Sequence, residues 1–384
     1  MQDFMRWLLR CSRCGTAYED SASRWRCDCG GVLDLEFMPS FRPDLLCGRS
    51  HDLWQYREAL PVGDDIVTLG EPTTPLVPVQ FGAGTLLVKQ EQLFPTGSYK
   101  DRGAAILMTH LRDLGVSCVV EDSSGNAGCA VAAYAARAGI ACDIYVPVGT
   151  SPAKTAQVEA YGAILHYVPG TREDTASAAQ EAAVGSTYAS HVYNPWFLHG
   201  TKTFAYEVAE DLGWAAPDTV VVPAGNGTML LGAWIGFSEL KQAGVIDRVP
   251  RIIAVQAAAC APLVTAFDRN LPDPVGVIAG DTVAEGIAVA SPARGAQMLA
   301  AVRASGGRFV AVTEHEIRDS LDMCCARGWF VEPTSAAVIA GALRHAAQAS
   351  PDERIVTAFT GHGLKAAAKI APMLTHRERT TNAG

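Results

Sequence analysis

The strongest constraint on the fold is an alternation of short β-branched runs with alanine-rich stretches, which begins at Leu86. The strands expected from it cover residues 86–89, 118–121, 142–146, 164–168, 219–222, 251–256, 308–312 and 354–359. Helical patterns lie between most of them, at 127–138, 153–161, 201–212, 229–241, 314–327 and 334–347. Continuously apolar strands that alternate with helices favour a parallel sheet covered on both faces. The sequence therefore predicts an α/β fold with twisted, mostly parallel sheets flanked by helices.

Composition supports a large buried core and excludes several classes of protein. The chain has 384 residues, of which 18% are charged, a smaller share than the roughly 25% of typical soluble domains. The formal net charge of −9 does not suit a main partner that is a nucleic-acid backbone. The sequence has no uninterrupted run of about 20 apolar residues, so it predicts no membrane span. The N-terminal apolar run is too short for a signal peptide. We therefore expect a cytoplasmic protein with no nucleic-acid or membrane partner.

Four of the eleven cysteines lie within the first 30 residues, in the pattern C-x2-C-x12-C-x-C. They are Cys11, Cys14, Cys27 and Cys29. A glycine follows each pair, and tight turns there let backbone N–H groups point at the thiolates. Four thiolates on two turns form a closed tetrahedral Zn²⁺ site, which is structural rather than catalytic. Four free thiols on a surface loop are the alternative. We expect a zinc ribbon over residues 1–36, and the other cysteines as buried small apolar residues.

Two glycine-rich turns each separate a predicted strand from a predicted helix. One is SSGNAG at 123–128 and the other is PAGNGT at 223–228. Such a junction leaves free backbone N–H groups at a helix N-terminus, where they bind anions. Two junctions suit two anions, such as a cofactor phosphate and a substrate carboxylate. Neither turn has the dinucleotide or the P-loop pattern, and a tight turn with glycines for packing is the alternative for each.

A third turn, PTGSYKDRG at 95–103, contains Lys100. A lysine in an apolar, glycine-rich neighbourhood can lose its charge and act as a nucleophile, typically through a Schiff base. A phosphate site together with a Schiff-base lysine is what pyridoxal phosphate needs. The alternative is a surface lysine paired with Asp101.

These turns and a late motif, TGHGLK at 360–365, resemble the threonine synthases in order and spacing. That family belongs to the fold-type-II pyridoxal phosphate enzymes related to tryptophan synthase β. LGEPTTPL at 69–76 and the cysteine ribbon also look like family features, so the resemblance covers nearly the whole chain. It implies a two-domain enzyme, with a larger cofactor-binding domain over 37–115 and 200–384 and a smaller α/β domain over 116–199. A homodimer is also expected.

The resemblance assigns roles to individual residues. Lys100 would hold pyridoxal phosphate as a Schiff base and move protons as a base. Asn126 would bond the cofactor's 3-hydroxyl, and Thr360 would face the pyridine nitrogen, where a hydroxyl leaves the ring neutral and favours elimination and replacement. The cofactor phosphate would lie in the turn formed by Gly225, Asn226, Gly227 and Thr228. The substrate would be held by Ser123, Ser124 and Ala127 at its α-carboxylate, and by Lys154 at a phosphate.

The sequence departs from the family where threonine synthases bind the phosphate of O-phosphohomoserine. The family usually carries an Asn-Ser pair shortly before NP-x-R, but here Val192 replaces the serine and Phe197 the arginine. Ala127 stands where many members have threonine. Losing three of about four polar ligands costs several kcal/mol of phosphate affinity, at roughly 1.5–3 kcal/mol per charged hydrogen bond. The alternative is that His191 or His199 takes over phosphate binding.

We therefore expect a threonine-synthase-like lyase that catalyses β/γ-elimination or replacement on a small amino acid, with an altered substrate phosphate site. A true threonine synthase acting on O-phosphohomoserine, an ammonia-lyase and a cysteate-synthase-like β-replacement enzyme are the alternatives within this chemistry. A non-catalytic cofactor-binding scaffold whose ribbon docks a partner is the alternative of another class. The presence together of Lys100, Asn126 and Thr360 argues against it.

Overall fold

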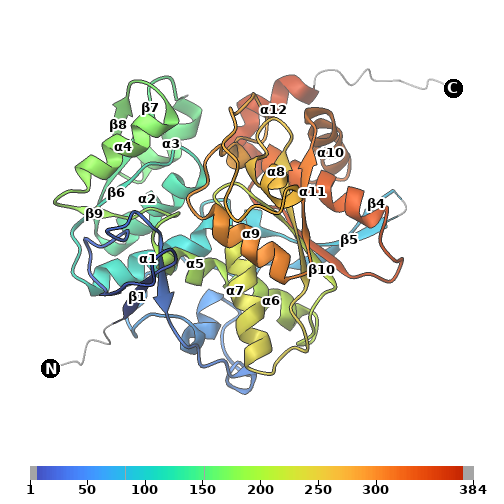
Figure 1. Ribbon diagram of the computed structural model, residues 1–384, viewed down its shortest axis with the longest axis horizontal. Coiled ribbons are helices and arrows are strands. Elements are labelled where there is room, and N and C mark those ends of the chain that lie inside the picture. Colours follow the sequence, from blue (N-terminus) through green and yellow to red (C-terminus); the bar gives the residue numbers. More distant parts are fainter. Residues whose placement is uncertain (1–6, 83, 151, 375–384) are drawn as a thin grey trace.

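The computed structural model describes residues 7–82, 84–150 and 152–374, and the side chains of 152–154 lie outside this description. Within it, strands form three sheets. Their orders are β12-β11-β10-β13-β5-β4, β8-β7-β6-β9 and β2-β1-β3. Figure 1 shows the green strands β6–β9 with helices α2–α4 at the upper left, and the red helices α10–α12 on the opposite side. The predicted α/β fold is confirmed.

The larger sheet is parallel except at one edge, where β4 pairs antiparallel with β5. Its central strand β10 has mostly β-branched side chains, and all of them are buried. Because successive side chains of a strand point to opposite faces, both faces of the sheet are covered here. Its strands are β4 (Leu76–Phe81), β5 (Gly84–Lys89), β10 (Thr219–Pro223), β11 (Arg251–Ala257), β12 (Arg308–Val312) and β13 (Ile355–Ala358).

The smaller sheet is entirely parallel, and its strands come from one continuous stretch of the chain. They are β6 (Cys118–Glu121), β7 (Ala141–Pro147), β8 (Ile164–Val168) and β9 (Thr187–Tyr188). The helices between them are α2 (Asn126–Ala138), α3 (Pro152–Ala160) and α4 (Arg172–Ala182). The carboxyl end of β6 leads directly into the SSGN turn, so this sheet positions that turn.

The first described residues form a small antiparallel sheet that carries the cysteines. Its strands are β1 (Leu8–Cys11), β2 (Ala17–Glu19) and β3 (Leu33–Glu36). Arg294, which is fully buried, joins this sheet to the rest of the protein. Its Nη2 donates to the carbonyl of Leu33 at 2.8 Å and to that of Tyr193 at 3.0 Å, and its Nε donates to that of Val192.

The remaining helices surround the larger sheet and fill the space between the two larger sheets. The α-helices are α1 (Lys100–Asp113), α5 (Pro195–Thr201), α6 (Thr203–Asp211), α7 (Thr228–Gln242), α8 (Pro262–Asp268), α9 (Gly295–Ala304), α10 (Glu314–Ala326), α11 (Pro333–Ala346) and α12 (Ala367–Leu374). The 3-10 helices are η1 (Pro43–Leu45), η2 (Leu53–Ala59), η3 (Glu91–Leu93), η4 (Glu285–Ile287) and η5 (Gly363–Ala366). No described helix is long and apolar enough to cross a membrane.

Two sequence expectations need correction. The helix expected at 201–212 is divided at Lys202, where α5 ends and α6 begins. Not all cysteines outside the ribbon are buried, because Cys47 is exposed and Cys118 and Cys325 are partly exposed. The domain boundaries at residues 36, 115 and 199 stay a prediction.

Candidate active site

Lys100 lies at the first residue of α1, and its amine contacts the second glycine-rich turn. Nζ of Lys100 donates to Oγ1 of Thr228 at 2.8 Å, and the Tyr99 hydroxyl lies 2.9 Å from the same oxygen. Lys100 is not paired with Asp101, whose buried carboxylate accepts from the backbone N–H of Thr96 at 2.8 Å instead. The structure therefore brings together the lysine and the turn that the sequence predicted as a phosphate site.

The turn before α7 has no room for side chains at its two glycines. A Cβ at Gly225 would lie 2.6 Å from the carbonyl oxygen of Gly286, and one at Gly227 would overlap Met298. Gly227 also has a φ of 83°, in the left-handed region that favours glycine. The turn leaves free backbone N–H groups at the start of α7, where the helix dipole favours an anion.

The geometry of Lys100 and this turn fits pyridoxal phosphate. That cofactor carries its aldehyde and its phosphate arm on neighbouring ring carbons, so the lysine and the phosphate site must also be neighbours. The 2.8 Å contact between Lys100 and Thr228 meets this requirement. The hydroxyl of Ser98, two residues before the lysine, is buried with no hydrogen-bond partner among the described residues, and a bound polar group would provide one.

Asn126, the first residue of α2, and Thr360, which follows β13, meet at one carboxylate. Nδ2 of Asn126 donates to Glu332 at 2.8 Å, and the Thr360 hydroxyl donates to the other oxygen of Glu332 at 2.6 Å. The carbonyl of Thr360 accepts from the N–H of Tyr99 at 3.1 Å, which places Thr360 beside the lysine turn. Sequence reasoning missed Glu332. A lone glutamate before a proline has no spacing that marks it, and only the fold brings it to these partners.

Ser123, Ser124 and Ala127 surround the N-terminus of α2 beside Asn126, as predicted. The N–H of Gly125 donates to the hydroxyl of Ser123 at 3.3 Å, and a Cβ at Gly128 would overlap the Ser123 carbonyl. Glycine is therefore required at 128 for this turn to close. Lys154 belongs to α3, but its side chain lies outside the described part, so its predicted role stays a prediction.

Phe197 forms a buried aromatic wall at the position where the resemblance to threonine synthases implies an arginine. Its ring is fully buried in α5, and its centre lies 5.6 Å from Nζ of Lys100. A Cβ at Gly103 would overlap this ring, so Phe197 packs directly against α1. The neighbouring Trp196 faces elsewhere, stacked at 3.6 Å on His110. Phe197 therefore presents an apolar surface near the lysine.

His191 lies next to the phosphate turn and is held by a buried glutamate. Its Nδ1 is 2.6 Å from Oε1 of Glu121, and its Nε2 is 3.3 Å from Nδ2 of Asn226. Burial lowers the pKa of His191 well below its usual value and raises that of Glu121 well above its own. His199 instead packs edge-on against Phe37, at 5.5 Å between ring centres. Of the two histidines considered from sequence, His191 is the one that contacts the turn.

Glu121 and Asp122 were also missed, although a signal was present. These two acids end an apolar strand directly before a predicted anion-binding turn. Negative side chains are unusual next to an anion site, because like charges repel. Asp122 accepts from the Tyr188 hydroxyl at 2.9 Å and pairs with Arg172 at 2.9 Å. Glu121 has no cationic partner of this kind, and its Oε2 has no hydrogen-bond partner in the described structure.

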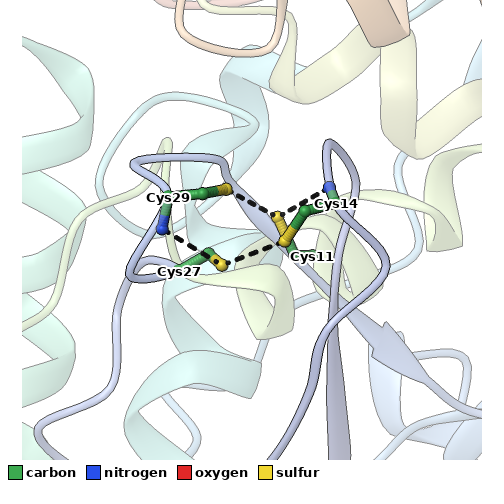
Figure 2. A group of neighbouring side chains, drawn as sticks. All are labelled: Cys11, Cys14, Cys27 and Cys29. Atoms are coloured by element: carbon green, nitrogen blue, oxygen red, sulfur yellow. Dashed lines mark hydrogen bonds between the residues drawn. The ribbon is translucent and has the colours of Figure 1, made fainter.

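The ribbon cysteines converge on one point (Figure 2). Sγ of Cys11 lies 3.5 Å from that of Cys29, and Sγ of Cys14 lies 3.5 Å from that of Cys27, with all four sulfurs within 4.8 Å of one another. Zinc–sulfur bonds of about 2.3 Å in a tetrahedron place sulfurs about 3.8 Å apart. Backbone N–H groups of Cys14 and Cys29 point at neighbouring sulfurs, as expected for thiolates. The set of ligands fits a structural zinc ion.

Comparison with known proteins gives one family. The family model described as pyridoxal-phosphate dependent enzyme matches residues 67–361. The threonine synthase of Methanocaldococcus jannaschii is 36% identical over 375 residues, which are 93% of this chain and 93% of that protein. The threonine synthase of Mycobacterium tuberculosis is 38% identical over 323 residues, 81% of this chain and 87% of that protein.

Solved structures share the fold at lower identity. A fungal L-serine ammonia-lyase from Rhizomucor miehei has a TM-score of 0.70 and 20% identity, over 81% of this chain and 99% of that one. O-ureido-L-serine synthase has a TM-score of 0.66 and 22% identity, over 81% of this chain and 95% of that one.

Proposed function

This chain belongs to the threonine synthase family of pyridoxal-phosphate-dependent enzymes, and from that premise we propose that Lys100 holds the cofactor and that the substrate is a small amino acid without a distal phosphate. It is a pyridoxal-phosphate-dependent lyase of the kind that eliminates or replaces a group on an amino acid. The observation that carries the proposal about the substrate is the Phe197 ring near Lys100, where the family has an arginine.

The residues near Lys100 supply each contact that the cofactor needs. Bound pyridoxal phosphate withdraws electrons from the α-carbon of an attached amino acid, which makes the α-proton acidic. Gly225, Asn226, Gly227 and Thr228 would hold its phosphate. Asn126 and Thr360 would orient its ring; the Thr360 hydroxyl, which donates to Glu332 in this structure, would turn its one proton to the ring nitrogen. Lys100 would then accept the α-proton, since its amine already lies beside the phosphate turn.

Substrate orientation follows from the start of α2. Ser123, Ser124 and the N–H of Ala127 would bind the α-carboxylate, because the helix N-terminus offers free donors there. The other end of the substrate would face Phe197 and His191. A dianionic phosphate against a phenyl ring and a buried glutamate would be desolvated without enough partners, which is costly. This favours a smaller or less charged leaving group over O-phosphohomoserine.

A comparison of substrates tests this proposal. kcat/KM would be measured for O-phosphohomoserine, phosphoserine, serine, threonine and diaminopropionate, with cofactor absorbance followed in parallel. We expect an unphosphorylated amino acid to be preferred. If O-phosphohomoserine wins by more than about a hundredfold, roughly 2.7 kcal/mol of transition-state preference, the protein is a true threonine synthase with relocated ligands. A cofactor spectrum that no amino acid changes would instead support a non-catalytic scaffold.

A structural zinc ion is the second part of the proposal. The sulfur distances in the ribbon support it. Metal analysis of the purified protein should find about one zinc per chain, and Cys14→Ser should remove it. Cys47→Ser, which changes an exposed cysteine outside the cluster, is the matched control and should retain zinc. Protein without zinc, or zinc lost only in the control, would contradict the assignment.

Domain division, assembly and location are also part of the proposal. The smaller sheet lies within residues 118–188, and the strands of the larger sheet lie at 76–89 and 219–358, which supports a smaller domain over 116–199. A homodimer would be checked by light scattering. A compartment that keeps the four ribbon thiols reduced suits the zinc site, which favours the cytoplasm.

A further inference from the structure

Glu121 and His191 form a buried ionisable pair beside the phosphate turn. The two side chains are 0% and 4% exposed, and 2.6 Å separates Oε1 of Glu121 from Nδ1 of His191. The second carboxylate oxygen, Oε2, is buried without a hydrogen-bond partner among the described residues. A buried, half-satisfied carboxylate is costly, so its presence at a functional site needs a chemical reason.

The pair has two protonation forms. In one, Nδ1–H donates to the Glu121 carboxylate and Nε2 accepts from the amide of Asn226, and the net charge is −1. In the other, Nε2 carries a proton that it donates to the amide oxygen of Asn226 once that amide has turned over, and the net charge is zero. Burial disfavours net charge, which raises the pKa of Glu121, lowers that of His191 and so favours the neutral form. The charged groups that act on the pair are Lys100, Arg172 and Asp122.

The neutral form suits a hydroxyl rather than a phosphate at the far end of the substrate. A phosphate leaves as a stable anion, since its second pKa is about 6. Hydroxide is a far poorer leaving group, since the pKa of water is about 15.7, and it departs readily only when a proton is supplied. His191 and Lys100 both lie against the Phe197 ring, at 5.9 Å between the ring centres and at 5.6 Å from Nζ, so both are near the space where the substrate would bind.

We propose, building on the function proposed above, that His191 is a catalytic residue that gives a proton to the leaving oxygen, that Glu121 positions it, and that the substrate is a β-hydroxy amino acid. The α-proton moves to the Lys100 amine. The Cβ–O bond breaks with its electron pair on oxygen, and that oxygen takes the proton of Nε2. A water molecule leaves and a Cα–Cβ double bond forms, with no oxidant or reductant required. The negative charge left on the pair is offset by the positive charge gained by Lys100.

Leaving-group dependence tests the assignment. L-serine needs a proton on its leaving oxygen, whereas β-chloro-L-alanine releases chloride, which needs none. We expect His191→Asn and Glu121→Gln to lower kcat/KM for serine by about 10²–10⁴-fold, the usual contribution of general acid catalysis, and to lower it for chloroalanine by less than about tenfold. The control is His166→Asn, which removes a partly exposed histidine 2.7 Å from Asp143 on the outer strands and should change neither rate.

Two further measurements do not depend on turnover. Nitrogen NMR of histidine-labelled holoenzyme should show a proton on Nε2 of His191 at neutral pH, assigned by its loss in His191→Asn, and Glu121→Gln should weaken that signal. Cofactor affinity should be unchanged in both variants. A wild-type His191 without an Nε2 proton at neutral pH overturns the proposal even if the variants fold poorly.

The outcomes separate this inference from the function on which it rests. Equal losses for serine and chloroalanine, or weakened cofactor binding, would make His191 a structural residue. A wild-type preference for a phosphate ester, with KM raised by His191→Asn, would make it a relocated phosphate ligand. Turnover of chloroalanine but not serine overturns the inference alone. Turnover of neither overturns the proposed function as well.

Discussion

Removing the Arg294 side chain should weaken the packing of the ribbon against the loop that carries His191, Val192 and Tyr193. Its guanidinium is fully buried and donates to the backbone carbonyls of Leu33, Val192 and Tyr193. It also pairs at 2.8 Å with Asp34, which is partly exposed. The same side chain therefore holds strand β3 and the residues directly after His191. Arg294→Met keeps most of the stem and removes every one of these donors.

The size of the effect follows from the acceptors left behind. Each buried carbonyl without a donor costs about 1–3 kcal/mol, and three lose their donor. Part of this is recovered, because the guanidinium no longer has to be desolvated. Water can also reach the carbonyl nearest Asp34. We therefore expect the free energy of unfolding to fall by about 2–5 kcal/mol.

Urea unfolding and hydrogen exchange would measure this. Trp25 packs at 5.0 Å between ring centres on both Tyr188 and Tyr193, so its fluorescence reports on ribbon docking. Exchange should rise in residues 7–36 and 188–193 together. Arg303→Met is the control, because it removes a partly exposed arginine of α9 that donates to one carbonyl, that of Leu271, and should cost no more than about 1 kcal/mol. A loss below about 1 kcal/mol for Arg294→Met, with unchanged exchange at 188–193, would show that the ribbon and loop are not coupled through this residue.

Three other perturbations test the cofactor site and the ribbon. Lys100→Ala should abolish turnover and remove the absorbance band of the lysine-bound cofactor, whereas Lys241→Ala, which changes an exposed lysine in the last turn of α7, should keep both. Thr360→Asp should lower cofactor occupancy, because its carboxylate would lie against Glu332. The double variant Thr360→Asp with Glu332→Gln should bind the cofactor again and give more of the transamination side product. An unchanged product ratio in the double variant would mean that residue 360 does not touch the cofactor ring. Chelation of zinc should raise hydrogen exchange first in residues 7–36 with little change in kcat, so a large fall in kcat on chelation would assign the ribbon a catalytic part.

Most strands of the two larger sheets were predictable because their signal is local, but the two-residue strand β9 was not predicted. Residues 220–222 are valines with no exposed surface, and any parallel strand covered on both faces needs such a run. β4 was missed because it is an antiparallel edge strand with Pro78 inside it, and its exposed side breaks the apolar run. α1 was missed for the opposite reason. Every residue from Asp101 to Leu111 is buried, polar ones such as Arg102 and His110 included, so burial in this helix does not follow an amphipathic pattern.

Only those residues of the site that lie within recognisable sequence motifs were predictable. The turns around Lys100 and Thr228 carry recognisable patterns, and the structure joins them by one hydrogen bond. Glu332 and Glu121 carry no pattern of their own. Each acquires its partners through the packing of distant segments. Glu332 accepts hydrogen bonds from Asn126 at the start of α2 and from Thr360 after β13, and Glu121 contacts a histidine from the loop before α5. Sequence periodicity contains no information about such pairings.

Two independent features of the site change its electrostatics in the same direction. Phe197 presents an uncharged, fully buried ring near Lys100, where the resemblance to threonine synthases implies an arginine. Glu121, on the strand that leads into the substrate turn, forms a buried pair with His191 whose net charge burial holds at zero, so the pair supplies no positive charge either. A site for a dianion would need a positive charge at both places. Asp122 on the same strand end is paired with Arg172, so the positive charge of that arginine is compensated as well. A distal group that offers a hydrogen bond without a negative charge is the one that this arrangement can bury.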